Sequence, residues 1–525
     1  MKTQFRRMLA CLLSALLFVG MAAACGSDKK PASSRTTTTA GGESTTTASG
    51  EETEETNPFE ETTEGDATGD STASAAAKTN TPTESQTAKP PTQTNAPTTS
   101  GLPAINLGGA TITIRTVWEE AFGAGNKEKS KIGDLWMAKR KEIETKYNCR
   151  IVNKVMNPND TTVQIIAKVK SGDTKLGDVL VCQRLDLERS RLAKGVLTDL
   201  NTVANLNLKD SRWNKALITA STFGGKTYGA GFGMPDVQSG MLVNLDLLKK
   251  INPKFDIFQL VEQNKWTYDK FIEVCALATK DLNNDGKFDE NDQYGATGIN
   301  SPTMQALVMG NGLRILQPDG KGRMQYVLNN QTNIDTINYL RDNLVFKNYW
   351  KSFSSNDAAA KALLGGRVLF LGTPAWAVLE YQEKSKINFG FVPAPLGTNG
   401  KEKNYINLGD GWAQVLCIPT TNKNPERIGA VLSEFLMLSG QIRSLTIDMY
   451  ENEYFPNHAP SMVGIKKMLD NPLYDYFIPE VGDKAPWDAI MQGLWVEDTT
   501  FAKKLQEIDT SYKKSVDDYY NKNME

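Results

Sequence analysis

The sequence predicts an α/β protein with a largely parallel sheet in its first globular part. Apolar, β-branched runs alternate there with segments whose apolar residues recur at helical spacing. This alternation is typical of strand–helix–strand units that build a parallel sheet. One run, DVLVC, is almost continuously apolar, as buried parallel strands are. The expected order is a strand at Thr111–Trp118, a helix at Leu135–Tyr147, a strand at Cys149–Met156, a helix at Thr161–Val169 and a strand at Asp178–Cys182.

The N-terminus has the pattern of a secretory leader. Three basic residues lie in Met1–Arg7, and the apolar run Met8–Ala24 ends in small residues. The cysteine that follows, Cys25, resembles the acylated cysteine of the bacterial lipobox, although Ala22 replaces the usual Leu. We therefore expect residues 1–24 to be a lipoprotein signal peptide and Cys25 to carry palmitate-type acyl chains on the extracellular face of the cell membrane. An uncleaved signal anchor is the alternative, and it also places the rest of the chain outside.

Residues 25–103 are expected to be a tether. They consist mostly of Thr, Ser, Ala, Pro and Glu, with one Phe and no aliphatic periodicity. Such a segment cannot bury enough apolar surface to offset the entropy of ordering, so we expect it to stay disordered. It would hold a globular body away from the membrane.

Composition excludes several classes of function. A net charge of −2 gives no basic footprint for nucleic acid. The single histidine, His458, argues against histidine-based catalysis and is expected at the surface. The four cysteines beyond the N-terminus show no metal-ligand spacing and are expected to be free thiols, without a Cys149–Cys182 disulfide.

The stretch Ala362–Pro419 places two tryptophans next to predicted strands. A strand at Val368–Leu371 and a Gly-Thr-Pro turn lead to Trp376. Two more apolar runs follow, at Phe389–Val392 and Trp412–Ile418, separated by a Pro- and Gly-rich loop. This arrangement predicts aromatic faces lining a cleft.

Motifs along the globular body resemble one family. The segment YGAGFGMP, followed by MLVN and LDLLKK, is similar to the "YG-x-P … L-x-YN-x-D-L" segment of family 1 extracellular solute-binding proteins, with Val243 where Tyr is usual. These are the ABC-importer receptors related to maltose-binding protein. Four other blocks agree with the family in order and spacing: GVLTDL, KWTYDKFIEVCALATK, GGRVLFLGTPAW and NPERIGAVLSEFLM.

The resemblance implies a two-lobed, periplasmic-binding-protein-like fold of class II with hinge crossings and an extra C-terminal helical region. The implied division is 104–236 for the first part of the first lobe, 237–391 for the second lobe, 392–438 for the second part of the first lobe, and 439–525 for a helical part packing mainly on the second lobe. The chain would return across the hinge near Phe391–Pro395.

The resemblance also implies a carbohydrate ligand between the lobes. Apolar sugar faces suit aromatic rings, and sugar hydroxyls suit Asp and Arg side chains. Pro374 occupies the position of a stacking Trp in maltose-binding protein, so only part of that motif carries over to Trp376. The expected ligand-binding residues are Trp118, Arg184, Asp236, Trp376, Asp410 and Trp412.

The loop DLNNDGKFDEND resembles an EF-hand-type calcium loop. Its oxygen side chains alternate, Gly286 permits the sharp turn, and the last position is Asp instead of the usual Glu. We expect a structural Ca²⁺ site, with a solvated Asp/Asn/Gly turn as the alternative. The expected ligands are Asp281, Asn283, Asp285, the backbone carbonyl of Lys287, Asp289 and Asp292.

Together these features predict a monomeric, lipid-anchored solute-binding protein that captures a carbohydrate, most simply an oligosaccharide, and delivers it to ABC permease subunits. The alternatives are a receptor that presents its ligand to a membrane sensor, a peptide-binding lipoprotein and a secreted glycoside hydrolase. No pair of carboxylates in the sequence stands out as hydrolase machinery, so we expect no catalytic residues.

Overall fold

The structure is a computed structural model, and it describes the globular body. The described residues are 99–116, 131–155, 161–184, 187, 193–231, 236–298, 301–319, 323–398, 403–409, 413–456, 458–475 and 485–521. The signal peptide, Cys25 and the tether up to residue 98 lie outside the described residues, and their predicted roles stay predictions. The predicted end of the tether at residue 103 is corrected, because Ser100 bonds to Glu434 and Leu102 packs against the first-lobe core.

The first lobe is built on a four-stranded sheet of order β13-β3-β1-β2. Strand β1 (Ala110–Thr116) pairs in parallel with β2 (Cys149–Val155) and β3 (Val179–Gln183), as the alternation of strands and helices predicts. The fourth strand, β13 (Gln414–Cys417), is antiparallel to β3 and comes from far along the chain.

The second lobe has its own four-stranded sheet of order β11-β6-β10-β7. Strand β10 (Val368–Thr373) is parallel to β7 (Tyr294–Gly298) and antiparallel to β6 (Gly240–Asn244). Strand β11 (Phe389–Pro393) is antiparallel to β6 on its other side. The stretch Ala362–Pro419 therefore contributes strands to both sheets.

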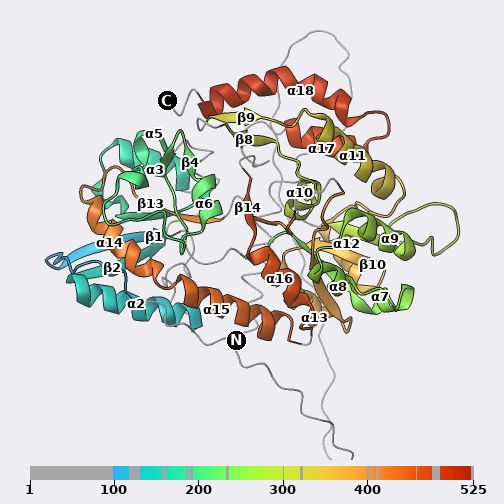
Figure 1. The fold of residues 1–525 in the computed structure, drawn as a ribbon, viewed down its shortest axis with the longest axis horizontal. Coiled ribbons are helices and arrows are strands. Elements are labelled where there is room, and N and C mark those ends of the chain that lie inside the picture. Colours follow the sequence, from blue (N-terminus) through green and yellow to red (C-terminus); the bar gives the residue numbers. More distant parts are fainter. Residues whose placement is uncertain are drawn as a thin grey trace, which may run out of the picture. The chain divides into compact units, whose positions relative to one another are not determined.

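Helices cover both sheets (Figure 1). Those of the first lobe are α2 (Lys131–Tyr147), α3 (Thr161–Lys170), α5 (Ala193–Val196), α6 (Lys215–Ala220) and α14 (Pro425–Leu436). Those of the second lobe are α7 (Leu245–Ile251), α8 (Ile257–Glu262), α9 (Tyr268–Ala278), α10 (Ser301–Met309), α11 (Gln331–Leu340), α12 (Asn356–Leu364) and α13 (Val378–Lys384).

The C-terminal part is helical and packs on the second lobe. It contains α15 (Ser439–Met449), α16 (Ser461–Leu469), α17 (Ala485–Trp495) and α18 (Phe501–Val516), with the short strand β14 (Pro472–Tyr474) between α16 and α17. Buried residues of α16, α17 and α18 belong to the same apolar cluster as the second-lobe sheet. Helix α15 links the lobes, because Ile442 lies in the first-lobe core and Tyr450, just beyond the helix, lies in the second-lobe core.

The return to the first lobe comes later than the sequence predicts. The expected boundary at residue 392, within Phe391–Pro395, is corrected, because β11 pairs with β6 through Pro393. Leu396 and Leu408 also lie in the second-lobe core. The chain rejoins the first-lobe sheet only at Gln414. The Pro- and Gly-rich loop that looked like a crossing instead follows a strand of the second-lobe sheet.

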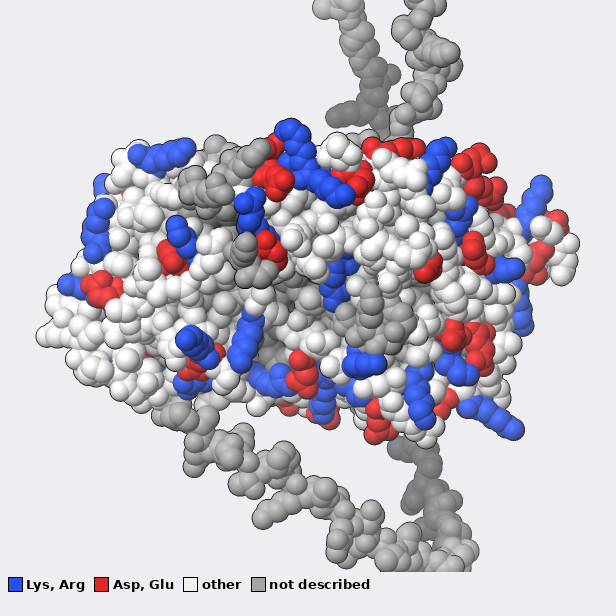
Figure 2. Space-filling view, turned by 45° about the horizontal axis from the view of Figure 1, so that its top comes forward, with Lys and Arg blue, Asp and Glu red and all other residues white. Residues whose placement is uncertain are grey.

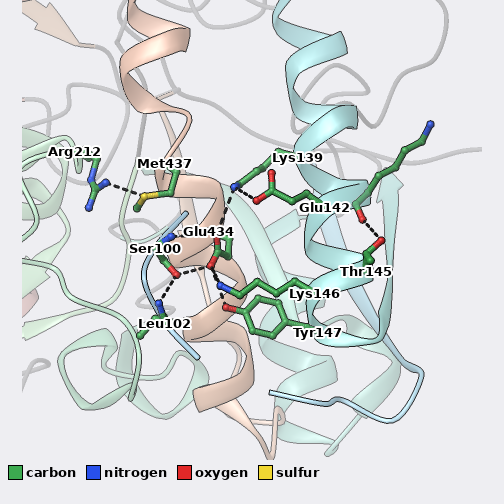
Figure 3. Close-up of polar contacts among 11 residues, drawn as sticks. Ser100, Leu102, Lys139, Glu142, Thr145, Lys146, Tyr147, Arg212, Glu434 and Met437 are labelled. Carbon is green, nitrogen blue, oxygen red and sulfur yellow. Dashed lines mark hydrogen bonds and ion pairs between the residues drawn. The ribbon is translucent and has the colours of Figure 1, made fainter. Parts of the chain in front are cut away.

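A buried carboxylate joins the N-terminal end of the described chain to the first lobe (Figure 3). Glu434 of α14 has no exposed side-chain surface, and its carboxylate accepts hydrogen bonds from the hydroxyl and backbone N–H of Ser100. Lys146 Nζ lies 2.6 Å from Glu434 Oε1, Tyr147 Oη donates at 3.2 Å, and Lys139 Nζ lies 3.4 Å from Oε2. Burial alone would raise the pKa of Glu434, but the bonds from Lys146 and Ser100 outweigh it and lower that pKa.

The surface carries both signs of charge interspersed, with no extended patch of one sign on the face drawn in Figure 2. None of the helices in the described part is both long and apolar enough to cross a membrane. The four cysteines of the globular body are free thiols, as predicted. The prediction that His458 is a plain surface residue is wrong, because its ring is half-buried and lies 4.6 Å from the ring of Phe258.

Candidate functional site

Three connections between the lobes meet at one cluster of residues. The first passes through Asp236 and Val237, the second through Asn407, and the third ends at Tyr450. Val237 N donates to Tyr450 Oη at 2.9 Å, and Asn407 Nδ2 donates to the backbone oxygen of Asp236 at 3.1 Å. Gln238 N in turn donates to Asn407 Oδ1 at 3.2 Å. These bonds tie the three connections together, and we call this group the hinge cluster.

Burial fixes the polar members of the hinge cluster. Asn407 and Tyr450 are both fully buried, so each must find its hydrogen-bond partners inside the protein. Burial raises the pKa of Tyr450 well above its ordinary value, and the charge of Asp236 adds to the shift. Tyr450 also begins a π-helical turn, Tyr450–Tyr454, directly after α15. Such turns are common at functional positions in helices.

Asp236 is the exception in this cluster, because its side chain is exposed. The surrounding protein nevertheless raises the pKa of its carboxyl by desolvation. An accessible surface and a desolvated carboxyl together describe a group that opens to solvent on one side and has protein on the others. Among the described residues, none makes a hydrogen bond or ion pair with this carboxylate. Asp236 is therefore a candidate for a ligand contact.

Trp376 lies beside the same crossing. It belongs to the short 3-10 helix Ala375–Ala377, which follows β10 after Pro374. Ala375 N donates to Val237 O at 2.9 Å, so the neighbours of Trp376 and Asp236 are hydrogen-bonded to each other. The indole is half-buried and packs in part against the second-lobe core. The structure therefore brings two of the predicted ligand-binding residues together.

Two threonines at strand ends were not predicted. Thr116 ends β1 in the first lobe, and Thr373 ends β10 in the second lobe. Both side chains are fully buried, and their hydroxyls have no hydrogen-bond partner within the described structure. Ligands of open α/β sheets bind beyond the carboxyl ends of the strands, but at 0% exposure neither hydroxyl is open to a ligand in this arrangement. No local pattern in the sequence distinguishes these two threonines from other β-branched strand residues, whereas tryptophans and charged residues at strand ends stand out.

Arg184 occupies the expected end of β3 but is not open to a ligand. Its side chain is 1% exposed, and its guanidinium carbon lies 6.0 Å from the ring centre of Tyr474. Its backbone N donates to Ala413 O at 2.7 Å. In this arrangement Arg184 faces the ring of Tyr474, and its predicted role as a ligand contact is not supported.

The remaining predicted ligand-binding residues, Trp118, Asp410 and Trp412, lie outside the described residues. Asp410 and Trp412 fall in the short connection from β12 (Asn407–Gly409) to β13. In the sequence this connection runs from Asn407 of the hinge cluster to Ala413, whose backbone oxygen accepts the hydrogen bond from Arg184 N.

The predicted calcium loop is folded as a turn held by its own carboxylates. Asp281 accepts hydrogen bonds from the backbone N–H groups of Asn284 and Gly286, at 2.7 and 2.8 Å. Asp292, only 1% exposed, accepts from Leu282 N and Asp289 N. The oxygen-only donor set suits Ca²⁺. However, no group of three or more Asp, Glu, His or Cys side chains in the described structure is gathered closely enough to hold a metal ion.

A family comparison assigns the class of protein. Residues 153–436 match the family model described as bacterial extracellular solute-binding protein, and this match spans more than half of the chain. The chain belongs to that family, which confirms the resemblance seen in the motifs and the two-lobed α/β fold. The family and the similar structures are binding proteins and not enzymes. No curated protein matches the chain.

Solved structures of similar fold give the particular relatives. A cyclic α-maltosyl-1,6-maltose binding protein from Arthrobacter globiformis superposes with a TM-score of 0.56 at 14% identity, over 78% of this chain and 100% of the other. UspC of M. tuberculosis superposes with a TM-score of 0.54 at 12% identity, over 77% of this chain and 100% of UspC. A cyclo/maltodextrin-binding protein complexed with maltotetraose gives 0.53 at 15% identity, over 79% and 98%. At these identities the comparison establishes the fold.

Proposed function

We propose that this protein binds a carbohydrate between its two lobes and delivers it to an ABC importer. The observation that carries the proposal is the backbone hydrogen bond between Ala375 and Val237, which brings the neighbouring residues Trp376 and Asp236 to the same crossing at the hinge cluster. An indole face stacks on the apolar C–H face of a sugar, and a carboxylate accepts hydrogen bonds from adjacent hydroxyls. The ligand would stabilise the closed arrangement by contacting both lobes.

The solved relatives support the choice of ligand class. They include a cyclo/maltodextrin-binding protein complexed with maltotetraose and a cyclic α-maltosyl-1,6-maltose binding protein.

The mature protein would be held outside the cell by acyl chains on Cys25, with residues 25–98 as a tether. This part of the proposal rests on the leader pattern and on the extracellular character of the family. Metabolic labelling with a palmitate analogue tests it. Label should enter the wild-type protein and be absent from Cys25→Ser.

Calcium in the loop 281–292 is a separate proposal. It rests on the spacing of oxygen side chains in the sequence and on the turn at Gly286 (φ +78°). Because the carboxylates already bond to backbone N–H groups, binding would require them to turn toward the ion.

The ligand test uses the chain from residue 25 onward with Cys25 replaced by Ser. A glycan array followed by calorimetry should identify oligosaccharides that bind with a defined stoichiometry. An absence of sugar binding at millimolar concentration, together with binding of peptides, would overturn the carbohydrate assignment. Release of new reducing ends during incubation would instead favour a hydrolase.

A further inference from the structure

Strand β14 lies in the C-terminal part but contacts both lobes. The helix before it, α16, packs on the second lobe, where Gly464 sits against the ring of Pro393. The buried residues of the following helices, α17 and α18, also lie in the second-lobe core. Between these helices the chain runs toward the first lobe, and Tyr474 at the end of β14 is buried there.

The backbone of β14 is fixed to the second-lobe side of the hinge. It pairs in parallel with β12, with Gly409 opposite Tyr474. Asn407 N also donates to Asn471 O at 3.1 Å. Strand β12 is itself held to the second lobe, because Leu408 N donates to Ser239 Oγ at 2.7 Å and the Leu408 side chain is in the second-lobe core.

The side chain of Tyr474, in contrast, is part of the first lobe. It is 5% exposed and lies in the apolar cluster on one face of the first-lobe sheet, with Leu217 of α6 and Cys417 of β13. Its ring also faces the guanidinium of Arg184 within cation–π distance. A ring buried in one lobe on a strand paired with the other must be withdrawn if the lobes separate at this point.

We propose that Tyr474 is a built-in latch between the lobes. Its insertion holds the lobes together without ligand and covers Arg184 at the carboxyl end of β3. The latch shifts the open–closed equilibrium of the ligand-free protein toward the closed arrangement, so that less of the binding free energy is spent on closure. This inference concerns the ligand-free protein and does not depend on which ligand binds.

Glycine at position 409 is a requirement of the latch. A Cβ built on Gly409 would lie 2.0 Å from Tyr474 Cε1, so any side chain here displaces the ring. The φ of Gly409 is outside the left-handed region, so the backbone tolerates alanine. Gly409→Ala is therefore a second, independent way to release the ring.

The test measures the distance between the lobes in ligand-free protein. Spin labels at Lys141→Cys in α2 and Lys249→Cys in α7, both exposed positions, report on the two lobes. The chain runs from residue 25, with Cys25 and Cys149 replaced by serine, because the other cysteines of the body are buried. Pulsed double-resonance spectroscopy gives the distance distribution.

We expect Tyr474→Ala and Gly409→Ala to broaden this distribution and shift it to longer distances. Tyr474→Phe, which keeps the ring, should retain the wild-type distribution. Tyr512→Ala is the matched control, because Tyr512 is equally buried but lies within the second-lobe core. Circular dichroism confirms that each variant is folded.

An unchanged distribution in folded Tyr474→Ala and Gly409→Ala overturns the latch. An equal shift in Tyr512→Ala overturns it as well, because general loosening of the C-terminal part would then explain the result. If a carbohydrate ligand is found, Tyr474→Ala should weaken its binding by the same factor by which it depopulates the closed state. A negative sugar screen leaves the distance measurement intact.

Discussion

Two carboxylates, Glu434 and Asp236, have opposite environments in this protein. Glu434 has no exposed side-chain surface and is surrounded by cations and hydroxyls, which lower its pKa. Asp236 is exposed, has no described partner for its carboxylate, and has a raised pKa because protein surrounds it. The buried carboxylate has several hydrogen-bond partners, and the accessible one has none among the described residues.

This difference in environment indicates a structural role for Glu434 and a binding role for Asp236. A buried charge that lost its partners would destabilise the fold, so Glu434 must be compensated within the chain. Asp236 has solvent to complete its hydrogen bonds, and a ligand can replace that solvent. A carboxyl without a described partner, near an aromatic residue at a hinge, is therefore a better indicator of a binding site than a carboxyl that already has several hydrogen-bond partners.

The largest expected effect is on stability, from Glu434→Gln. The variant leaves Lys139 and Lys146 without their shared buried partner and should lower the free energy of unfolding by about 3 kcal/mol. Urea denaturation followed by tryptophan fluorescence measures this. Ligand affinity of the folded variant should be unchanged.

The pH dependence gives a second measurement of the same group. Because its pKa is lowered in the folded state, ionised Glu434 contributes stability above the pKa of the unfolded chain, and that contribution is lost as pH falls through the folded value. The stability gap between wild type and Glu434→Gln should therefore narrow below about pH 4. A gap of constant size across this range would show that the charge of Glu434 is not what stabilises the protein.

Asp236→Asn should weaken ligand binding without lowering the stability of the fold, in contrast to Glu434→Gln. It removes the charged acceptor of the proposed site and should weaken ligand binding by about 2 kcal/mol, roughly 30-fold, in calorimetry. The pKa of Asp236 is higher in the folded protein than in the unfolded chain, so the wild type loses stability as the pH rises from the unfolded pKa to the folded one. Asp236→Asn does not titrate, so its stability relative to wild type should increase over this pH range. Asp178→Asn is the control, because burial also raises the pKa of Asp178, which lies away from the hinge. Equal loss of affinity in both variants would contradict the assignment.

Trp376→Ala should weaken ligand binding, because the contact between the indole ring and the ligand is lost. The ring contact itself should account for about 1 kcal/mol, in addition to the free energy from the apolar area that is no longer buried. Trp376→Phe should recover part of the affinity, because a smaller aromatic face remains. Trp266→Ala is the matched comparison, since Trp266 is fully buried in the second-lobe core. That variant should lower stability, whereas Trp376→Ala should act mainly on affinity.

Most elements of the fold could be predicted from periodicity. The predicted strands at Cys149–Met156 and Phe389–Val392 agree with β2 and β11 to within a residue at either end. What periodicity could not give was the sheet to which a strand belongs. β11 and β13 have similar apolar runs, and only long-range pairing sends one to each lobe.

The site was predictable only in part. Trp376 and Asp236 could be placed at a crossing because each follows a recognisable strand or crossing motif, and their role in ligand binding stays a prediction. Tyr474 and Tyr450 were not, because they reach the hinge from the C-terminal part, and no local pattern shows that a short strand will pair with β12. The prediction that Arg184 contacts a ligand failed for the same reason. The residue that faces its guanidinium, Tyr474, lies almost three hundred positions later in the chain, and no local pattern links the two.

The calcium loop tests a third kind of carboxylate, one that bonds to backbone N–H groups and remains near solvent. If the loop binds calcium, the gain in unfolding free energy should be about 0.4 kcal/mol at a concentration equal to Kd and should increase with concentration. Differential scanning calorimetry with added CaCl₂ measures it, with MgCl₂ as the ionic control. Asp285→Ala should abolish the shift, whereas Asp342→Ala, an exposed acid outside the loop, should keep it. A shift that survives Asp285→Ala would place any calcium elsewhere and leave the loop as a hydrogen-bonded turn, whose carboxylates, like that of Glu434, serve the fold alone.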